Sequence, residues 1–511
     1  MLHTSENNRR IAKNTLLLYF RMLFMLAINL YTARIVLKVL GVIDYGINNV
    51  VAGVIGLLGF ITGALAGSSS RFITFDLGKG NLNAMKRTFG NILCIHLLAA
   101  ICILFAGETI GLWFVSTQLK IPAEREFAAF WVYQFSILTS VLAVISVPYN
   151  ATIIAHEKMS AFAYITILDA ILKLLVVYML IVIPFDKLIM YATLYFVIQA
   201  FDQIIYMYYC RKNFEEARTK IRFDRTQFKE ILSYSGWTLN GYLACIGFTQ
   251  GINILLNIFF GPIVNAARGI AVQVQGVCQQ FCSNFQMALN PQLTKSYAQN
   301  DLEYMHKLLI KSSKFSFYIL YLITLPLMFE ANQILEWWLG EIPDHTANFL
   351  RLTLWIGLLY TLSNPIIVSV HATGKIKYFQ MIEGTMLLTI VPIAYLLLKY
   401  IRIAPEFIFL VHILVEICTQ YVRLRIVLPM IQMPIHYYIQ KVMYPIFLIL
   451  FLSPIIPMIV YLQMENGVIR FFTVCIISVL SSGITMYFIG CTKTERIFFT
   501  DKIYSILKKT K

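Results

Sequence analysis

Long apolar bands recur along the whole of this 511-residue chain, and they decide what it can fold into. Each band holds about 20 residues, which is the length that an α-helix needs to cross the hydrocarbon core of a bilayer. Only 13% of the residues are charged, about half the share usual in soluble proteins. The pattern predicts an all-α, polytopic membrane protein with about fourteen transmembrane helices. They lie near residues 14–37, 44–66, 89–115, 128–153, 161–184, 188–209, 236–260, 266–290, 315–337, 348–370, 379–400, 405–427, 443–462 and 469–490.

The 42 lysines and arginines are distributed unevenly over the predicted loops. If the N-terminus is cytoplasmic, about 30 of them fall at the cytoplasmic face, as the positive-inside rule requires. We therefore expect both termini in the cytoplasm. The net charge of +16 then reflects this topology and attraction to anionic membrane lipids. Because the basic residues are spread over many short loops, we expect no nucleic-acid binding.

Two halves of the chain resemble each other. The matches have an offset of 220 at Gly41 and Gly261 and at segments 81–89 and 301–309, and of 217 at Pro148 and Pro365. They predict an N-lobe of six helices (1–210), a cytoplasmic linker (211–234), a C-lobe of six helices (235–428), and two appended helices with a basic tail (429–511). Six is an even number, so the two repeats share one orientation, as in transporters whose lobes rock around a central cavity.

Polar side chains on three of the predicted helices lie along one face of each helix. The helix at 266–290 carries Arg268, Gln275, Gln279, Gln286 and Asn290, the first helix carries Arg21 and Asn29, and the seventh carries Asn253 and Asn257. Unpaired amides in hydrocarbon cost about 2–7 kcal/mol each, so lipid cannot cover such a row. The pattern favours a water-filled cavity lined by these three helices. Two alternatives remain: the amides pair between packed helices, and Arg21 reaches back to the cytoplasmic surface.

Four charged residues are candidates for ion coupling. Glu383 and Glu416 lie deep in their bands, and Asp169 lies four residues before Lys173. Each acid could bind a proton or a sodium ion, or could neutralise a nearby base. The histidines and the nine cysteines show no ligand spacing, so we expect no metal and no other cofactor. The short outer loops group no acid, histidine and arginine, so we do not expect an enzyme such as a polymerase or ligase.

Two segments resemble the multidrug/oligosaccharidyl-lipid/polysaccharide (MOP) exporter superfamily, in its bacterial polysaccharide and O-antigen flippase branch. They are ARIVLKVLGVIDYG (33–46) and FGPIVNAARGIAVQVQGVCQQFCSNFQMALNPQLTKSYAQND (260–301), and the proline–lysine turns at 148–158 and 365–375 fit as well. The resemblance implies a MATE-like V of two six-helix lobes, alternating access, and a place in the bacterial cytoplasmic (inner) membrane.

The resemblance also implies a cargo, an undecaprenyl-pyrophosphate-linked oligosaccharide moved from the cytoplasmic to the outer leaflet. Such units feed O-antigen, capsule or exopolysaccharide synthesis, with glycosyltransferases and a polymerase as partners. Arginine suits phosphate oxygens and amides suit sugar hydroxyls, so Arg21 and Arg268 are expected to bind the pyrophosphate. The alternative in the same superfamily is a proton- or sodium-coupled multidrug exporter, for which an acid in the cavity is expected where the first helix has an arginine.

Overall fold

The computed structural model describes residues 2–56, 58–119, 121–182, 184–218, 223–497 and 500. This part of the chain is helical and contains no β-strand, which confirms the predicted all-α class. The first half forms α1 (Leu2–Gly56), α2 (Gly59–Lys79), α3 (Leu82–Ala106), α4 (Leu112–Gln118), α5 (Glu126–Ala155), α6 (Met159–Val182) and α7 (Lys187–Asn213). The second half forms α8 (Arg225–Phe260), α9 (Pro262–Ala298), α10 (Leu302–Phe329), α11 (Ala331–Leu339), α12 (Thr346–Thr373), α13 (Lys377–Leu388), α14 (Ile390–Leu396) and α15 (Glu406–Met430). The appended segment forms α16 (Ile435–Tyr438), α17 (Tyr444–Leu452), α18 (Ile455–Gln463) and α19 (Val468–Thr485).

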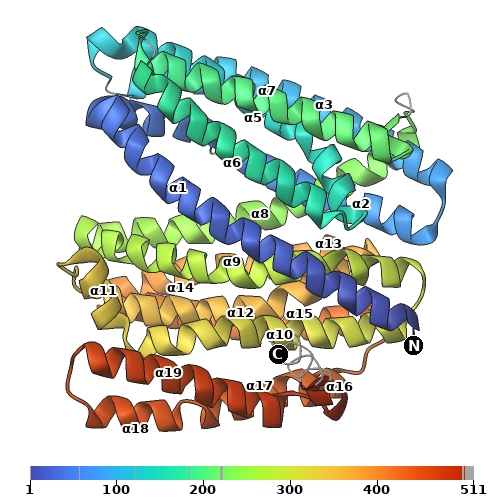
Figure 1. The fold of residues 1–511 in the computed structure, drawn as a ribbon, viewed down its shortest axis with the longest axis vertical. Coiled ribbons are helices and arrows are strands. Elements are labelled where there is room, and N and C mark those ends of the chain that lie inside the picture. Colours follow the sequence, from blue (N-terminus) through green and yellow to red (C-terminus); the bar gives the residue numbers. More distant parts are fainter. Residues whose placement is uncertain are drawn as a thin grey trace, which may run out of the picture. The chain divides into compact units, whose positions relative to one another are not determined.

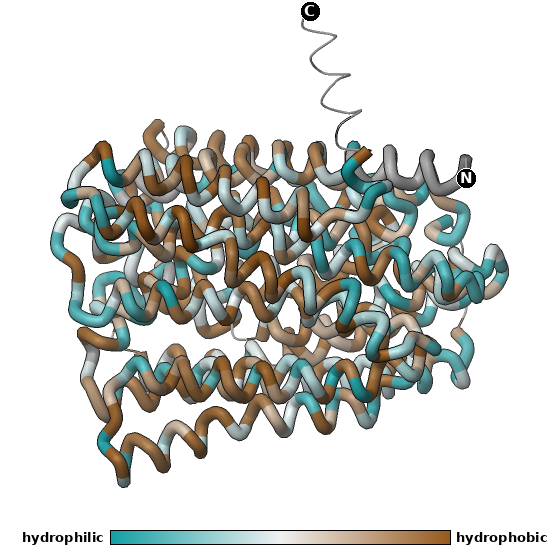
Figure 2. The backbone as a smooth tube through the Cα atoms, turned by 90° about the horizontal axis from the view of Figure 1, so that it is seen from below, coloured by the Kyte–Doolittle hydropathy of each residue, from teal (hydrophilic) through white to brown (hydrophobic). Residues whose placement is uncertain are grey.

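All fourteen predicted segments fall on helices, but not all of these helices are long and apolar enough to cross a membrane. Within the described residues, 11 helices are long and apolar enough to cross a membrane, or 12 if the bent pair Ile43–Gly56 and Gly59–Lys79 forms one span. The predicted segments 14–37 and 266–290 lie on α1 and α9, outside this set. The amides and the arginine of α9 make it more polar than its neighbours. Many of the hydrophilic stretches lie near the helix ends, with hydrophobic stretches between them (Figure 2).

Residue contacts divide the chain into two compact units. Unit 1 contains the chain up to Leu243, together with Thr294–Asp301 and Ile376–Gln380, and unit 2 contains the remainder. The helices α8, α9 and α13 therefore each contribute to both units. These boundaries differ from the sequence-based lobes at one end of each of these three helices. In addition, α8 begins at Arg225, inside the segment predicted as the linker.

Each unit is a bundle of long helices (Figure 1). In unit 1, α5 packs against α2, α3 and α7, and α1 packs against α6. In unit 2, α12 packs against α10 and α15. The appended α19 packs against α10 and α18, so the last helices cover a face of the C-terminal six-helix repeat.

Backbone conformation supports the internal duplication. Left-handed φ values occur at Gly41 (77°) and Gly261 (84°), and at Gly80 (69°) and Asn300 (60°), both pairs having the predicted offset of 220. A third pair, Glu157 (56°) and Gly374 (77°), has the offset of 217. Such φ values are uncommon outside glycine and cluster in special turns. Their recurrence at the same offsets indicates that the two halves turn at equivalent points.

The helix bounds follow the same offset. Residues 5–40 of α1 correspond to α8, and residues 42–78 correspond to α9. The first half contains one extra break in this stretch, between Gly56 and Gly59, where the two helices meet at 48°. The C-terminal copy, α9, runs through this position without interruption. The polar stripe predicted on residues 266–290 therefore lies on one continuous helix.

An ion-pair cluster in unit 1 includes Asp44, which lies in the segment 33–46 that carries part of the family resemblance. Arg125 Nε donates to Asp44 Oδ1 at 2.8 Å, and Arg125 Nη1 donates to Asp186 Oδ2 at 2.5 Å. Asp186 also caps α7 by accepting from the backbone N–H groups of Leu188 and Ile189. Burial raises the pKa of the Asp186 carboxyl, but these hydrogen bonds outweigh it and hold the pKa below its ordinary value. The cluster ties the chain after Gly41 to the starts of α5 and α7.

Candidate functional site

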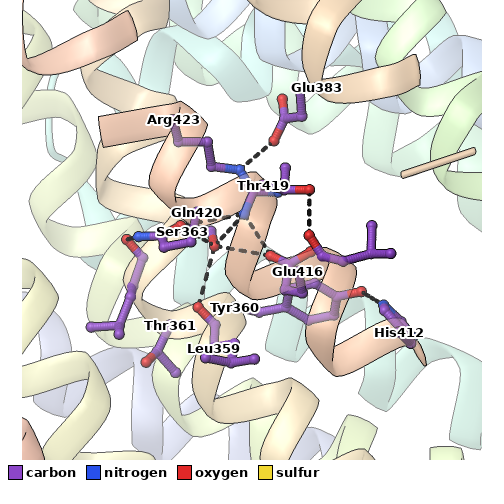
Figure 3. A network of polar contacts seen from close by, with 12 residues as sticks. Leu359, Tyr360, Thr361, Ser363, Glu383, His412, Glu416, Thr419, Gln420 and Arg423 are labelled. Atoms are coloured by element: carbon purple, nitrogen blue, oxygen red, sulfur yellow. Dashed lines mark hydrogen bonds and ion pairs between the residues drawn. The ribbon is translucent and has the colours of Figure 1, made fainter. Parts of the chain in front are cut away.

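A buried arginine joins two glutamates inside unit 2 (Figure 3). Arg423 Nε donates to Glu383 Oε1 at 2.6 Å, and Arg423 Nη1 donates to Glu416 Oε1 at 2.5 Å. The same Nη1 donates to Ser363 Oγ at 2.8 Å, and Ser363 Oγ lies 2.9 Å from Gln420 Oε1. The residues come from α12, α13 and α15. The arginine and Glu416 side chains are 3% and 0% exposed, so this pair is shielded from solvent.

With both glutamates ionised, the network would have one more negative than positive charge. One arginine faces two glutamates, and Glu416 Oε2 has no hydrogen-bond partner among the described residues. One turn before Glu416 on α15, the buried His412 is hydrogen-bonded to the Tyr360 hydroxyl at 3.0 Å. Phe248 packs edge-on against the His412 ring. The unpaired carboxylate oxygen and the histidine are two proton-accepting groups in one buried region.

Arg268 is buried between α8 and α9. It donates through Nη1 to Asn253 Oδ1 and through Nη2 to the Thr249 carbonyl at 3.3 Å. Both partners are neutral, and Arg268 Nε has no hydrogen-bond partner in the described part of the chain. Asn253 in turn donates to Gln250 at 3.0 Å. The structure therefore brings together two residues that the sequence placed in one cavity, Arg268 and Asn253.

The amide stripe of α9 faces α12. A Cβ atom built at Gly357 would lie 3.3 Å from Gln275 Nε2 and 3.4 Å from Gln279 Oε1. Gln286 Nε2 donates to the Thr361 carbonyl at 3.1 Å. These are contacts between packed helices, which the sequence left open as the alternative to a cavity. Asn290 is half-buried at the end of the stripe, and Asn257 is exposed on α8. A contact of these amides with substrate remains a prediction.

A second charged cluster lies inside unit 1. Lys173 Nζ is 2.9 Å from Asp169 Oδ2 on α6, as the spacing of four residues predicted. Asp202 on α7 lies close enough to Asp169 for the two carboxyl groups to interact electrostatically. Lys173 also lies 5.8 Å from the centre of the Tyr195 ring.

Arg21 is half-buried and faces α6 of unit 1. Its guanidinium carbon lies 4.7 Å from the centre of the Phe162 ring, which is a cation–π distance. Asn29, two turns further along α1, is exposed. A pyrophosphate contact for either residue remains a prediction.

The charged clusters of the two units lie on equivalent helices. The cluster in unit 1 joins α6 and α7, the fifth and sixth helices of the first repeat, and the cluster in unit 2 joins α13 and α15, their counterparts. Each cluster contains two carboxyl groups and one base. Arg423 was not among the residues predicted from the sequence, although it lies three residues after Gln420 and seven after Glu416, on the same helical face. This spacing was the available signal.

Known proteins share the fold of this chain. No family model matches the chain, and no curated protein matches it. Solved structures do match: a MATE protein in the straight conformation has a TM-score of 0.71, at 14% identity over 85% of this chain and 97% of that one. An outward-facing multidrug resistance MATE-family transporter of the MOP superfamily has a TM-score of 0.69, at 14% identity over 84% and 96%.

A MOP-superfamily transporter from Pyrococcus furiosus, described as having a binding pocket of reverse polarity, also matches. Its TM-score is 0.67, at 14% identity over 83% of this chain and 96% of that one. The chain therefore has the fold of MATE transporters of the MOP superfamily. At this level of identity the likeness is one of fold, and it confirms the MATE-like architecture that the resemblance implied.

Proposed function

We propose that this protein is a flippase that moves a polyprenyl-pyrophosphate-linked oligosaccharide from the cytoplasmic to the outer leaflet by alternating access. Glycosyltransferases that build the unit and a polymerase that consumes it are the partners this proposal implies. The MATE-like fold supports a transporter, and the proposal assigns no catalytic step to the chain. Within this proposal, Arg268 on α9 is the residue that binds the pyrophosphate of the cargo.

The observation that carries the proposal is the environment of Arg268. Arg268 is 7% exposed, and burying a charge without a counter-charge is costly. The described partners of Arg268 are an amide oxygen and a carbonyl oxygen, which do not cancel its charge. An anionic group such as a pyrophosphate would cancel it and would fill the donor left unused at Nε.

Arg268→Ala tests this role in cells that lack the native gene. We expect surface polysaccharide to fall about 10- to 100-fold, because a charge-assisted hydrogen bond contributes about 1.5–3 kcal/mol. Arg268→Lys keeps the charge but loses the planar guanidinium, so its polysaccharide level should lie between those of the wild type and Arg268→Ala. Polysaccharide is measured by immunoblot, together with the amount and thermal stability of the purified protein. Lys399→Ala, at an exposed cation in the same unit, is the control, and normal polymer in Arg268→Ala cells would refute the proposal.

A multidrug exporter is the second candidate, because matching structures include a multidrug resistance transporter. An organic cation would need an acid that is free to bind it. In unit 2, both Glu383 and Glu416 are paired with Arg423, and their side chains are 10% and 0% exposed. The matching transporter with a pocket of reverse polarity is consistent with different cargo charges on this fold. Drug resistance on overexpression, unaffected by Arg268→Ala, would favour the exporter.

We also propose that the two carboxyl clusters couple transport to a proton or a sodium ion. Asp169 with Lys173 in unit 1, and Glu383 with Glu416 in unit 2, each contain more acid than base once Asp202 and Arg423 are included. A proton or a sodium ion would balance the excess charge.

The coupling proposal predicts a specific loss in membrane vesicles. Glu416→Gln and Asp169→Asn should each reduce transport driven by a proton or sodium gradient by about tenfold, equivalent to 1.4 kcal/mol. Exchange without a gradient should persist, because Arg268, the proposed pyrophosphate ligand, is unchanged. Glu303→Gln, at an exposed acid paired with Lys307, is the matched control. A wild-type protein that responds to neither gradient would exclude coupling.

A further inference from the structure

Unit 2 contains an apolar groove of about 380 Å³ that the six-helix repeat alone does not form. One wall comes from α10 and α12, with Tyr321, Met328 and Trp355, and the other comes from α17 and α18, with Leu450 and Met458. The appended helices lie outside the duplicated part of the chain. The groove is therefore a property of their docking onto the C-terminal repeat.

The groove contains one charged group among the described residues that line it, Arg351. Arg351 Nε donates to the Met328 carbonyl at 2.9 Å, and Nη1 donates to Asn348 Oδ1 at 3.2 Å. Both partners are neutral, so the positive charge is not cancelled by them. The Tyr321 hydroxyl is already paired with Ser453 Oγ at 2.9 Å. The remaining lining is suited to hydrocarbon, with a cation at one place.

The dimensions and position of the groove suit a lipid chain. Arg351 lies five residues after the start of α12 at Thr346, about 7.5 Å along the helix axis. On α10, Tyr321 lies eight residues before the helix end at Phe329, about 12 Å along its axis. Both helices are long and apolar enough to span a membrane. The arginine is thus near the helix ends, where headgroups lie, and the apolar lining extends towards the helix middles.

We propose that the groove holds an acyl chain of an anionic phospholipid whose phosphate binds Arg351. Charge complementarity selects the headgroup, because a basic residue near a membrane surface attracts an anionic lipid with about 1 kcal/mol. The chain fills the space between α10, α12, α17 and α18, and so stabilises the attachment of the appended helices. This inference does not depend on which cargo the protein transports.

Native mass spectrometry of the purified full-length protein tests the proposal, with phosphatidylglycerol and phosphatidylcholine of identical acyl chains as probes. We expect the wild type to retain one phosphatidylglycerol in preference to phosphatidylcholine. Arg351→Gln should lower the affinity for phosphatidylglycerol about fivefold, which corresponds to the loss of one basic contact. Lys399→Gln removes an exposed cation from the same unit and should keep the preference.

A second variant keeps the test sharp if Arg351→Gln folds poorly. Leu450→Trp fills the groove but leaves the arginine, and should reduce binding of both lipids. The proposal would be overturned by equal retention of the two lipids by the wild type, by unchanged binding in both groove variants, or by an equal loss in Lys399→Gln. Preferential retention of undecaprenyl phosphate over phosphatidylglycerol would also overturn it, since the occupant would then be a polyprenyl lipid.

Discussion

Arg423→Ala is expected to leave little folded protein. The change removes the shared partner of Glu383 and Glu416, whose side chains are 10% and 0% exposed. Removing one partner of a buried ion pair costs about 3–5 kcal/mol, which is a large part of the 5–15 kcal/mol that stabilises a typical domain. The measurement is the fraction of monodisperse protein after detergent extraction and its thermal unfolding temperature.

Two further variants show whether charge is the cause. Arg425→Ala removes an exposed arginine two residues along the same helix, which bonds the Tyr421 hydroxyl, and should behave like the wild type. Adding Glu383→Gln and Glu416→Gln to Arg423→Ala removes the uncompensated charges and should recover most of the folded fraction. If Arg423→Ala is as stable as Arg425→Ala, the cluster does not stabilise unit 2.

The second large effect is expected at the turn between α5 and α6. Glu157 has a left-handed φ of 56°, where the repeat-equivalent residue is Gly374. A non-glycine residue in this conformation costs about 1–3 kcal/mol, so its side chain is expected to compensate. The Glu157 carboxylate is 1% exposed and lies 2.6 Å from Lys295 Nζ, on the last turn of α9. Lys295→Met should therefore destabilise unit 1 by about 3–5 kcal/mol.

A double substitution separates the charge from the strain. Glu157→Gly supplies the residue found in the second repeat and removes the carboxylate, so it should cost less than Lys295→Met. Combining the two should recover most of the stability lost in Lys295→Met alone, because no buried carboxylate remains. Thermal unfolding measures all three variants. Lys307→Met, which breaks an exposed pair with Glu303, is the control and should change stability by less than about 1 kcal/mol. Equal effects of Lys295→Met and Lys307→Met would contradict this account.

Most of the fold could be predicted because the bilayer imposes one length on every helix. The apolar bands, the duplication and its offsets all follow from local sequence, and Gly41 and Gly261 have the matching conformation. The break between Gly56 and Gly59 was not predicted. Its residues are as apolar as those of a continuous helix, and the equivalent stretch of α9 does not break, so periodicity holds no signal for it.

The candidate site was harder to predict, because helical periodicity gives a direction but not the neighbour in that direction. The stripe on α9 was recognised, yet only the structure shows that Gln286 meets the Thr361 carbonyl of α12. Likewise, the sequence showed that Glu383 and Glu416 lie deep in their helices, but it did not identify Arg423 as their partner. Arg423 lies near the end of α15, where an arginine is common. Its burial depends on packing against α12 and α13, which no local pattern reports.

The appended helices change what surrounds one of the two repeats. On α3 of the first repeat, Leu98, Ile101 and Phe105 are 46%, 63% and 71% exposed. Their counterparts on α10 at the offset of 220, Tyr318, Tyr321 and Leu325, are 4%, 1% and 5% exposed, in the repeat that α17–α19 cover. In a membrane, this face of the first repeat is thus left for lipid acyl chains to cover, whereas in the second repeat the appended helices cover most of it. Changes in membrane thickness should therefore act on this whole face in the first repeat, whereas in the second repeat lipid reaches it only at the groove that Tyr321 and Leu325 line.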